Sequence, residues 1–266
     1  MSASPFFRRS SAFLLAAFSA LALAQAPNQA GKAPSAYEPS VGQEGKDVVW
    51  VPTPQVVVDK MLDMARVTPR DFVMDLGSGD GRTVITAAKR GARALGIEYN
   101  PDMVALSKRN AEKEGVAGRA AFMKADLFET DFSDASVITM FLLPEINLKL
   151  RPKILRLKPG TRVVSNTFTM GDWQADQSVD LGANGGCNES WCTALLWIVP
   201  AHVAGAYKTP QGDLTLKQEF QRLSGTLRTE GKTFALEGKV RGEEIAFKAG
   251  GREYRGKLDG KRLELH

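Results

Sequence analysis

Apolar segments rich in Val, Ile, Leu and Ala alternate with amphipathic segments along most of the chain. Runs of this kind are typical of buried strands, whereas apolar residues three or four apart predict one face of a helix. Strands are therefore expected at 72–75, 94–98, 120–124, 136–141, 162–168 and 193–199. Helices are expected at 54–65, 81–90, 101–115 and 145–156. Strands that alternate with helices predict an α/β fold with a mostly parallel sheet covered on both faces.

The last two of these strands have no helical pattern between them. A polar, glycine-rich loop joins 162–168 to 193–199. The two strands are expected to pair antiparallel and to close the sheet, which makes the sheet mixed.

The pattern changes from helical spacing to strict alternation beyond residue 205. Apolar pairs two residues apart recur at Leu214/Leu216, Phe234/Leu236, Ile245/Phe247 and Leu263/Leu265. Turn-forming pairs separate them at Glu230-Gly231, Arg241-Gly242, Gly250-Gly251 and Asp259-Gly260. Residues 205–266 are thus predicted to form a small antiparallel β-meander of four or five strands, next to an α/β domain over 47–204.

The N-terminal segment has the pattern of an export signal. Arg8 and Arg9 precede an apolar run that ends with small residues at Ala22 and Ala24. The run is shorter than the ~20 residues that span a membrane, so no stable span is expected once residues 1–24 are removed. Residues 25–46 are rich in Ala, Pro, Gly, Gln and Ser and are interpreted as a disordered linker. A periplasmic or secreted protein is expected, the alternative being one anchored by an uncleaved signal.

Composition and charge limit the classes of partner. The 266 residues are 43% hydrophobic and 24% charged, which is ordinary for a globular protein. The formal charge is +5, but residues 205–266 hold 13 basic and 9 acidic side chains, and the signal holds two arginines. Residues 25–204 are therefore close to neutral, which argues against a nucleic-acid partner.

Cys187 and Cys192 are the only cysteines in the sequence. Two cysteines do not supply the ligands of a zinc site, and no metal is expected. In an exported protein a local disulfide is favoured, and two free thiols are the alternative.

The motif with the most chemical information is VMDLGSGDGR at 73–82. A strand ends in Asp75, and glycines then follow at every second position. Such a loop exposes bare backbone to a ligand, and the helix start beyond it offers unpaired N–H groups. Glu98 ends the next strand, at the interval of an acid that accepts both ribose hydroxyls. The pattern predicts a nucleoside-binding site.

The spacing distinguishes two nucleoside ligands. A dinucleotide fingerprint needs Gly or Ala at the sixth position from Gly77, where this chain has Arg82. An acid followed by G-x-G-x-G instead resembles the S-adenosylmethionine (SAM) sites of class I methyltransferases, which have a Rossmann-like seven-stranded sheet. There Asp126 would accept from the adenine amino group, and the Leu127 N–H would donate to a ring nitrogen. The expected cofactor-binding residues are Asp75, Gly77, Ser78, Gly79, Glu98, Asp126 and Leu127.

Further motifs extend this resemblance over roughly residues 48–200. They are VPTP at 51–54, DLGSGDGR at 75–82, GIEYN at 96–100, MFLLPEINLKL at 140–150 and RVVSNTF at 162–168. Together they resemble the ATP synthase c-subunit lysine methyltransferases and the archaeal protein-lysine methyltransferases. The resemblance implies a protein lysine as acceptor, entering near Phe141 to Asn147.

Candidate acceptor-site residues follow the fourth strand. Phe141, Leu142 and Pro144 suit a dry entrance, and Glu145 or Asn147 is placed to hold an incoming ammonium. Pro144, Glu145 and Asn147 are thus the predicted catalytic-site residues. The alternative for Glu145 is that it only begins a helix, where an acid is favoured. Trp173 either lines the entrance or is a buried aromatic at the sheet edge.

Three functions remain open from the sequence. The leading hypothesis is a SAM-dependent methyltransferase acting on a protein lysine. The others are a methyltransferase for a small molecule or lipid-linked metabolite, and a non-catalytic envelope binding protein with the same fold.

Overall fold

The computed structural model describes residues 37–182, 184–260 and 262–266. The expected export signal at 1–24 and the expected linker up to residue 36 lie outside these residues. No helix in the described ranges is long and apolar enough to cross a membrane.

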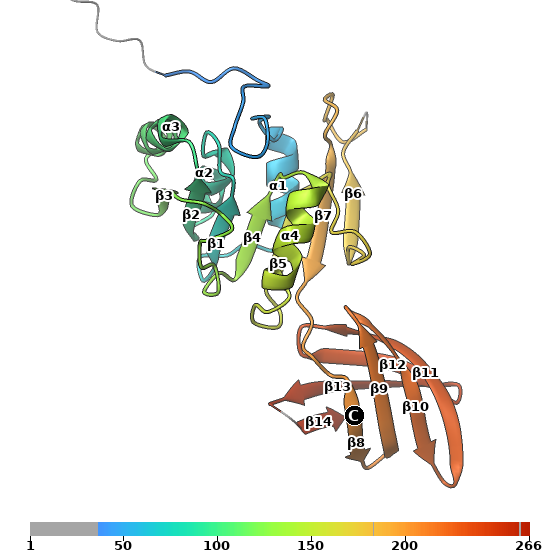
Figure 1. Ribbon diagram of the computed structural model, residues 1–266. Coiled ribbons are helices and arrows are strands. Elements are labelled where there is room, and N and C mark those ends of the chain that lie inside the picture. The colour runs from blue at the N-terminus through green and yellow to red at the C-terminus, as the bar shows by residue number, and fades with distance from the viewer. Residues whose placement is uncertain (1–36, 183, 261) are drawn as a thin grey trace, which may run out of the picture. The chain divides into compact units, whose positions relative to one another are not determined.

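The first sheet contains seven strands in the order β3-β2-β1-β4-β5-β7-β6 within the described residues (Figure 1). The strands are β1 (Phe72–Leu76), β2 (Arg93–Glu98), β3 (Ala120–Lys124), β4 (Val137–Met140), β5 (Arg162–Asn166), β6 (Gln177–Asp180) and β7 (Thr193–Ile198). Neighbours among β1 to β5 are parallel. β7 is antiparallel to both β5 and β6. The predicted mixed sheet is confirmed, including the antiparallel pairing of β5 with β7.

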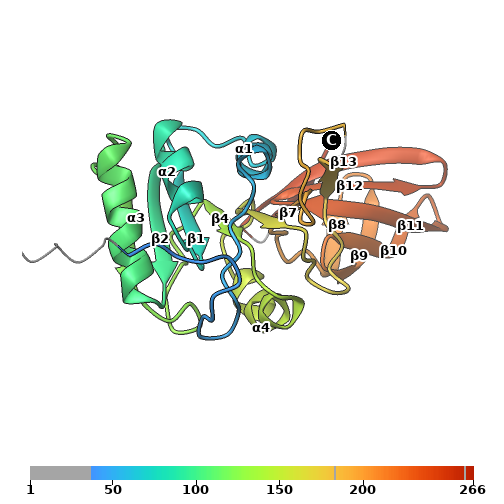
Figure 2. The same cartoon turned by 90° about the horizontal axis from the view of Figure 1, so that it is seen from above.

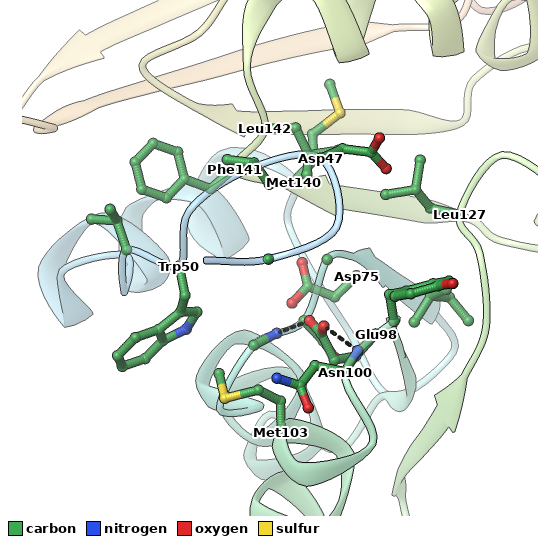
Figure 3. A pocket seen from close by; sticks show the side chains of 18 of the residues that line it. Asp47, Trp50, Asp75, Glu98, Asn100, Met103, Leu127, Met140, Phe141 and Leu142 are labelled. Atoms are coloured by element: carbon green, nitrogen blue, oxygen red, sulfur yellow. Dashed lines mark hydrogen bonds between the residues drawn. The ribbon is translucent and has the colours of Figure 1, made fainter. Parts of the chain in front are cut away.

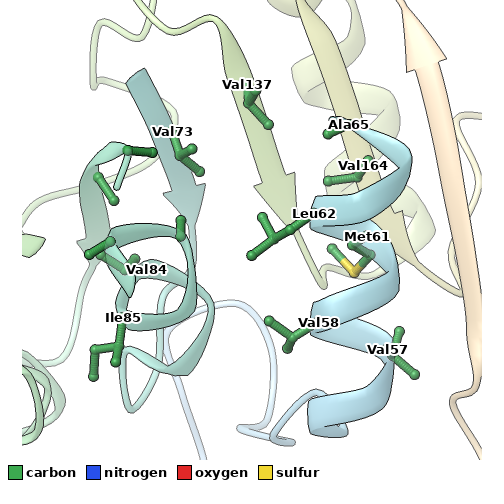
Figure 4. Close-up of a cluster of buried hydrophobic side chains, with 14 of the residues drawn as sticks. Val57, Val58, Met61, Leu62, Ala65, Val73, Val84, Ile85, Val137 and Val164 are labelled. Atoms are coloured by element: carbon green, nitrogen blue, oxygen red, sulfur yellow. The ribbon is translucent and has the colours of Figure 1, made fainter. Parts of the chain in front are cut away.

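Four helices cover this sheet within the described part of the chain. Figure 2 shows two of them, α1 and α4, on opposite sides of the strands. They are α1 (Gln55–Met64), α2 (Arg82–Lys89), α3 (Pro101–Lys113) and α4 (Pro144–Ile154). Alternate strand residues face opposite layers: Val73 and Val137 pack with α1 to α3, whereas Met74 and Ile138 pack with α4. Figure 4 shows the first layer, where α1 packs over β5 and β7 and its Val58 and Leu62 point toward the side of Val137. Both faces are buried, which explains the continuous apolar runs of these strands.

Two strand predictions need correction. β5 was expected to reach residue 168, but it ends at Asn166 because Thr167 has a φ of 60° and leaves the extended conformation. β6 was not predicted. Its sequence QSVD has a single half-buried apolar residue, Val179, because an edge strand needs little apolar surface.

The linker expected at 25–46 also differs in its last ten residues, which follow a defined course. Gly42 N–H donates to the Trp50 carbonyl at 2.8 Å, and Trp50 N–H donates to the Gln43 carbonyl at 2.9 Å. Lys46 pairs with Asp126, which lies 80 residues later in the chain. Composition indicated a linker, but these contacts fix the segment.

A second sheet follows from Gly205, where the meander was predicted to begin. Its seven described strands are β8 (Gly205–Thr209), β9 (Gly212–Glu219), β10 (Arg222–Thr229), β11 (Lys232–Arg241), β12 (Glu244–Ala249), β13 (Arg252–Asp259) and β14 (Arg262–Leu265). Each pairs antiparallel with the next. The prediction of four or five strands is too low, because β10 and β13 have glycine at inward positions and lack the expected alternation. Leu214, Leu227, Val240 and Phe247 contribute to a separate core for this sheet.

Candidate active site

One pocket lies at the carboxyl ends of the parallel strands, where open α/β sheets bind their ligands. Its walls come from the loops after β1, β2, β3 and β4, and from the N-terminal segment 43–53. All seven predicted cofactor-binding residues line it: Asp75, Gly77, Ser78, Gly79, Glu98, Asp126 and Leu127. Figure 3 shows Asp75, Glu98 and Leu127 around it.

The glycine loop is tied to β2 on one side and packs closely on the other. Gly77 and Ser78 N–H both donate to the Ile97 carbonyl at 2.9 Å. Gly79 has a φ of 52°, and a Cβ there would lie 2.6 Å from Trp50 Nε1. Glycine is therefore required at 79 both by the backbone conformation and by the indole that lies against it.

Ser78 contributes to the pocket through its backbone. Its hydroxyl is turned toward β2, because a Cβ built on Gly96 of that strand would lie only 2.5 Å from the Ser78 Oγ. That Oγ is buried and has no hydrogen-bond partner among the described residues.

Arg82 confirms why the loop is unlike a dinucleotide fingerprint. It begins α2, and its guanidinium pairs with the Asp80 carboxylate at 2.6 Å. A second N–H donates to the Thr53 carbonyl at 2.9 Å. The side chain thus anchors segment 43–53 instead of packing between helix and strand.

Asp75 is a buried acid at the end of β1, with 5% of its surface exposed. Burial raises the pKa of its carboxyl to about 7, and the nearby charges of Glu98 and Asp80 add to this. The Thr139 hydroxyl opposes the shift by donating to Oδ1 at 2.5 Å. A cationic group in the pocket would supply the opposite charge that this carboxylate lacks.

Glu98 is held in a fixed position by two backbone donors. Gly79 N–H donates to Oε2 and Asn100 N–H to Oε1, both at 2.9 Å (Figure 3). A carboxylate oxygen accepts more than one hydrogen bond, so both oxygens can still receive ligand hydroxyls.

Asp126 follows β3 and is paired with Lys46 at 2.5 Å. The hydrogen bond from Lys46, followed by that from Phe128 N–H, lowers the pKa of the Asp126 carboxyl. Lys46 Nζ also lies 4.9 Å from the centre of the Tyr99 ring. Segment 43–53 is thereby fastened across the end of the pocket where an adenine is expected.

The other end of the pocket is aromatic. Phe141, Phe168 and Trp191 line it beside Met140 and Leu142. Sequence reasoning included Phe141 but missed Phe168 and Trp191. The predicted antiparallel pairing of the last two strands could have identified Trp191. Because β7 runs antiparallel to β5, the residues just before β7 return to the carboxyl edge of the parallel strands.

The predicted catalytic residues lie beside the pocket, and none of the three is among the described residues that line it. Pro144 is the first residue of α4, and Glu145 is exposed in its first turn. Asn147 is fully buried, and its Nδ2 donates to the carbonyls of Phe168 and Thr169 at 3.3 and 3.1 Å. Asn147 therefore positions the Phe168 loop. An acceptor contact by Pro144 or Glu145 stays a prediction.

Trp173 does not line the entrance of the pocket but is a buried aromatic residue, the second of the two predicted alternatives. It is 0% exposed and its ring centre lies 6.3 Å from that of Trp197. Cys187 and Cys192 form the local disulfide that the sequence favoured.

These residues fit S-adenosylmethionine. The bare glycine backbone leaves room for the amino acid end, Asp75 complements an ammonium group, and Glu98 and Asp126 are placed for a ribose and an adenine.

Comparison with known proteins places the chain among methyltransferases. The family model described as the ANTKMT methyltransferase domain matches residues 75–177. A protein-lysine N-methyltransferase of Saccharolobus islandicus is 44% identical over 158 residues, covering 58% of this chain and 96% of that protein. The human ATP synthase c-subunit lysine N-methyltransferase is 38% identical, and the match covers 48% of this chain and 54% of the human protein.

A solved structure agrees with the fold. A protein described as an RNA methyltransferase from Salinibacter ruber, in complex with S-adenosyl-L-homocysteine, is 48% identical with a TM-score of 0.53. The match covers 57% of this chain and 96% of that one.

Proposed function

We propose, since the chain belongs to the family of the protein-lysine N-methyltransferases, that it transfers a methyl group from S-adenosylmethionine to a lysine side chain of another protein. One observation carries the proposal. A single pocket joins a cradle of glycine backbone and carboxylates to an aromatic end. The first part suits the methyl donor, and the second suits an acceptor with a long apolar side chain.

Each of the three carboxylates binds a different part of the cofactor, through charge or hydrogen bonding. Asp75 faces the ammonium of the amino acid end, and the two oxygens of Glu98 receive the ribose hydroxyls. Asp126 accepts from the adenine amino group, so Lys46 must share or release that carboxylate when the cofactor binds.

The acceptor end needs little chemical help. S-adenosylmethionine supplies an already activated methyl group, so alignment of the nucleophile gives most of the rate. The lysine nitrogen must lose a proton before it attacks, and the apolar side chains of Phe141 and Leu142 favour the neutral amine by desolvation. With S-adenosylmethionine bound, the nitrogen would bond to the methyl carbon as the carbon–sulfur bond breaks and its electron pair goes to sulfur. The product would be the protonated methyllysine, so the one proton released is the proton that the lysine ammonium loses before attack.

RNA is the second candidate acceptor, because the Salinibacter ruber relative is described as an RNA methyltransferase. Aromatic side chains can also stack on a base. The near-neutral charge of residues 25–204 disfavours it, since RNA-binding surfaces are basic.

The test is transfer of labelled methyl groups from S-adenosylmethionine to fractionated cell extract. We expect label in protein, recovered as methyllysine after acid hydrolysis. Asp75→Asn should abolish most of it, whereas Glu112→Gln, an exposed acid on α3, should not. Label confined to RNA or to low-mass compounds would replace the lysine proposal. No binding of the cofactor by calorimetry at millimolar concentration would favour the non-catalytic binding protein.

We further propose that the protein works outside the cytoplasm. The signal-like sequence at 1–24 supports this, and the Cys187–Cys192 disulfide suits an oxidising compartment. Mass spectrometry of the natural protein should find residue 25 or a close neighbour at the N-terminus, in a periplasmic or secreted fraction. An intact N-terminus in the soluble cytoplasmic fraction would contradict it.

A further inference from the structure

Three aromatic rings from separate segments meet at the acceptor end of the pocket. Phe141 follows β4, Phe168 follows β5, and Trp191 precedes β7. The Phe168 ring centre lies 5.8 Å from that of Phe141 and 5.2 Å from that of Trp191. The Phe141 and Trp191 centres are 6.3 Å apart.

These separations identify the type of surface. Ring centres 4.5–7 Å apart are in direct contact, so no side chain fits between the rings. The three residues therefore form a continuous wall, not a cage around a cation. A wall of this kind buries the methylenes of a lysine and removes water from its amine.

Phe168 is held at this wall by its own backbone. Thr167 has a φ of 60°, unusual for a β-branched residue, and this turns the chain out of β5. The Phe168 carbonyl then accepts from Ser165 Oγ at 2.9 Å and from Asn147 Nδ2. Strained backbone supported by several hydrogen bonds is typical of functional sites.

Trp191 is held differently, through its neighbour Cys192. The disulfide joins Cys192 to Cys187 with the Cα atoms 5.8 Å apart, and both cysteines belong to the core that contains α1. Between them Asn188, Glu189 and Ser190 are exposed, and Trp191 is the half-buried residue that lines the pocket. The covalent link thus closes a short loop whose one apolar side chain faces the acceptor end.

We propose that Trp191 is a specificity-determining residue for the acceptor, and that the Cys187–Cys192 disulfide holds its indole in the wall beside Phe141 and Phe168. The proposal rests on the lysine methyltransferase function proposed above. It assigns to the disulfide loop a role in acceptor binding and none in cofactor binding, because the cofactor cradle is built from the loops after β1, β2 and β3.

The experiment compares the wild type with Trp191→Ala, Trp191→Phe and the double variant Cys187→Ser/Cys192→Ser. Glu189→Gln is the matched control, since it is an exposed residue of the same loop. Calorimetry with S-adenosyl-L-homocysteine should give the same affinity within about twofold for all five proteins, which also shows that they are folded. With the protein acceptor found by labelling, Trp191→Ala and the double variant should raise KM about tenfold with a smaller change in kcat. Trp191→Phe should have a KM close to that of the wild type.

A second readout does not depend on turnover. Saturation-transfer NMR with n-butylamine, which resembles the end of a lysine side chain, is measured on protein saturated with S-adenosyl-L-homocysteine. The wild type, Trp191→Phe and Glu189→Gln should transfer signal from aromatic protons to the methylenes. Trp191→Ala and the double variant should lose most of this transfer.

The outcomes separate this inference from the function on which it rests. Wild-type protein that makes no methyllysine overturns the proposed function, and this inference with it. Active wild type with an unchanged KM and unchanged transfer in Trp191→Ala overturns the role of Trp191 alone. Loss in Trp191→Ala but not in the double variant overturns the role of the disulfide.

Discussion

Asp75 shows how one residue can link cofactor binding to pH. Its carboxyl is buried without a cationic partner among the described residues, and burial raises its pKa to about 7. Near neutral pH the free protein therefore contains both protonated and ionised Asp75. A ligand ammonium selects the ionised form, so binding releases a proton wherever the carboxyl was protonated.

We predict that S-adenosyl-L-homocysteine binds more weakly as pH falls below 7, approaching a tenfold loss per pH unit. Asp75→Asn should bind weakly at all pH values and lose this dependence. Calorimetry at pH 6, 7 and 8 measures both. An unchanged wild-type affinity from pH 8 to pH 6 would show that Asp75 does not pair with the ammonium.

The same shift has a consequence for stability without ligand. The folded-state pKa of Asp75 lies above the unfolded value of about 4, so the folded protein binds more protons between these values. This residue therefore lowers the free energy of unfolding as pH rises from 4 to 7. Asp75→Asn should gain stability relative to the wild type over that range, measured by urea unfolding at pH 5 and pH 8. An equal difference at the two pH values would contradict the raised pKa.

Asn147 was predicted to touch the acceptor, but its amide supports the Phe168 loop from within the core. We predict that Asn147→Ala costs about 1–3 kcal/mol of stability, because a fully buried side chain and its hydrogen bonds to the Phe168 and Thr169 carbonyls are lost. The acceptor KM should rise while S-adenosyl-L-homocysteine affinity stays the same. Unfolding curves, acceptor kinetics and calorimetry measure these three effects, and Lys149→Gln, at an exposed position of the same helix, serves as comparison. A variant that is unstable but has a normal KM would limit Asn147 to a purely structural role.

At the scale of elements, the spacing of apolar residues within each segment was enough to predict most strands and helices of the first sheet. The strands and helices up to α4 were located to within about two residues, because each has enough apolar residues at its own period. The cofactor loops were also found, since each acid lies within two residues of the carboxyl end of a strand. β6 was missed because its four residues bury little apolar surface.

The parts of the site that escaped prediction depend on long-range contacts. Segment 43–53 has a linker-like start, and its place on the pocket depends on long-range contacts, among them the pairing of Lys46 with Asp126 and the hydrogen bond from Arg82 to the Thr53 carbonyl. Trp191 lies in a polar loop, and it comes beside Phe141 because β7 runs antiparallel to β5. Neither fact is contained in the residues next to these positions.

Glycines inside the second sheet explain why its strands were undercounted. Gly225 of β10 and Gly256 of β13 occupy inward positions where alternation predicts apolar side chains. A Cβ at Gly225 would lie 1.9 Å from the Thr215 carbonyl oxygen of β9, and the residue has a φ of 151°. The close approach of the two backbones makes glycine necessary there.

We predict that Gly225→Val lowers stability by more than about 2 kcal/mol, since the new side chain overlaps backbone that cannot move away cheaply. Thr226→Val, the exposed neighbour on the same strand, should change stability by less than about 0.5 kcal/mol. Thermal unfolding of both variants provides the measurement. Equal melting curves would mean that β9 and β10 can separate without loss.

At the scale of the whole molecule, the described residues form distinct cores. Two clusters lie on the two faces of the first sheet, and the strands between them make those clusters one unit. The third cluster is built within residues 201–265 from inward side chains of the meander together with Ala201 and Val203 just before it. The pocket is lined by residues between 43 and 191, all of them before the meander. Ligand binding therefore stabilises the first unit directly.

We predict two transitions in calorimetric unfolding, of which only one responds to ligand. S-Adenosyl-L-homocysteine at one hundred times its dissociation constant should stabilise the α/β unit by about 2.7 kcal/mol and raise the melting temperature of that transition. Gly225→Val should lower the other transition and leave the ligand-dependent shift intact, because the meander contributes no residue to the pocket. A single transition that moves with both the ligand and the substitution would instead show that the two sheets unfold cooperatively, and that the meander is part of the stability on which the active site depends.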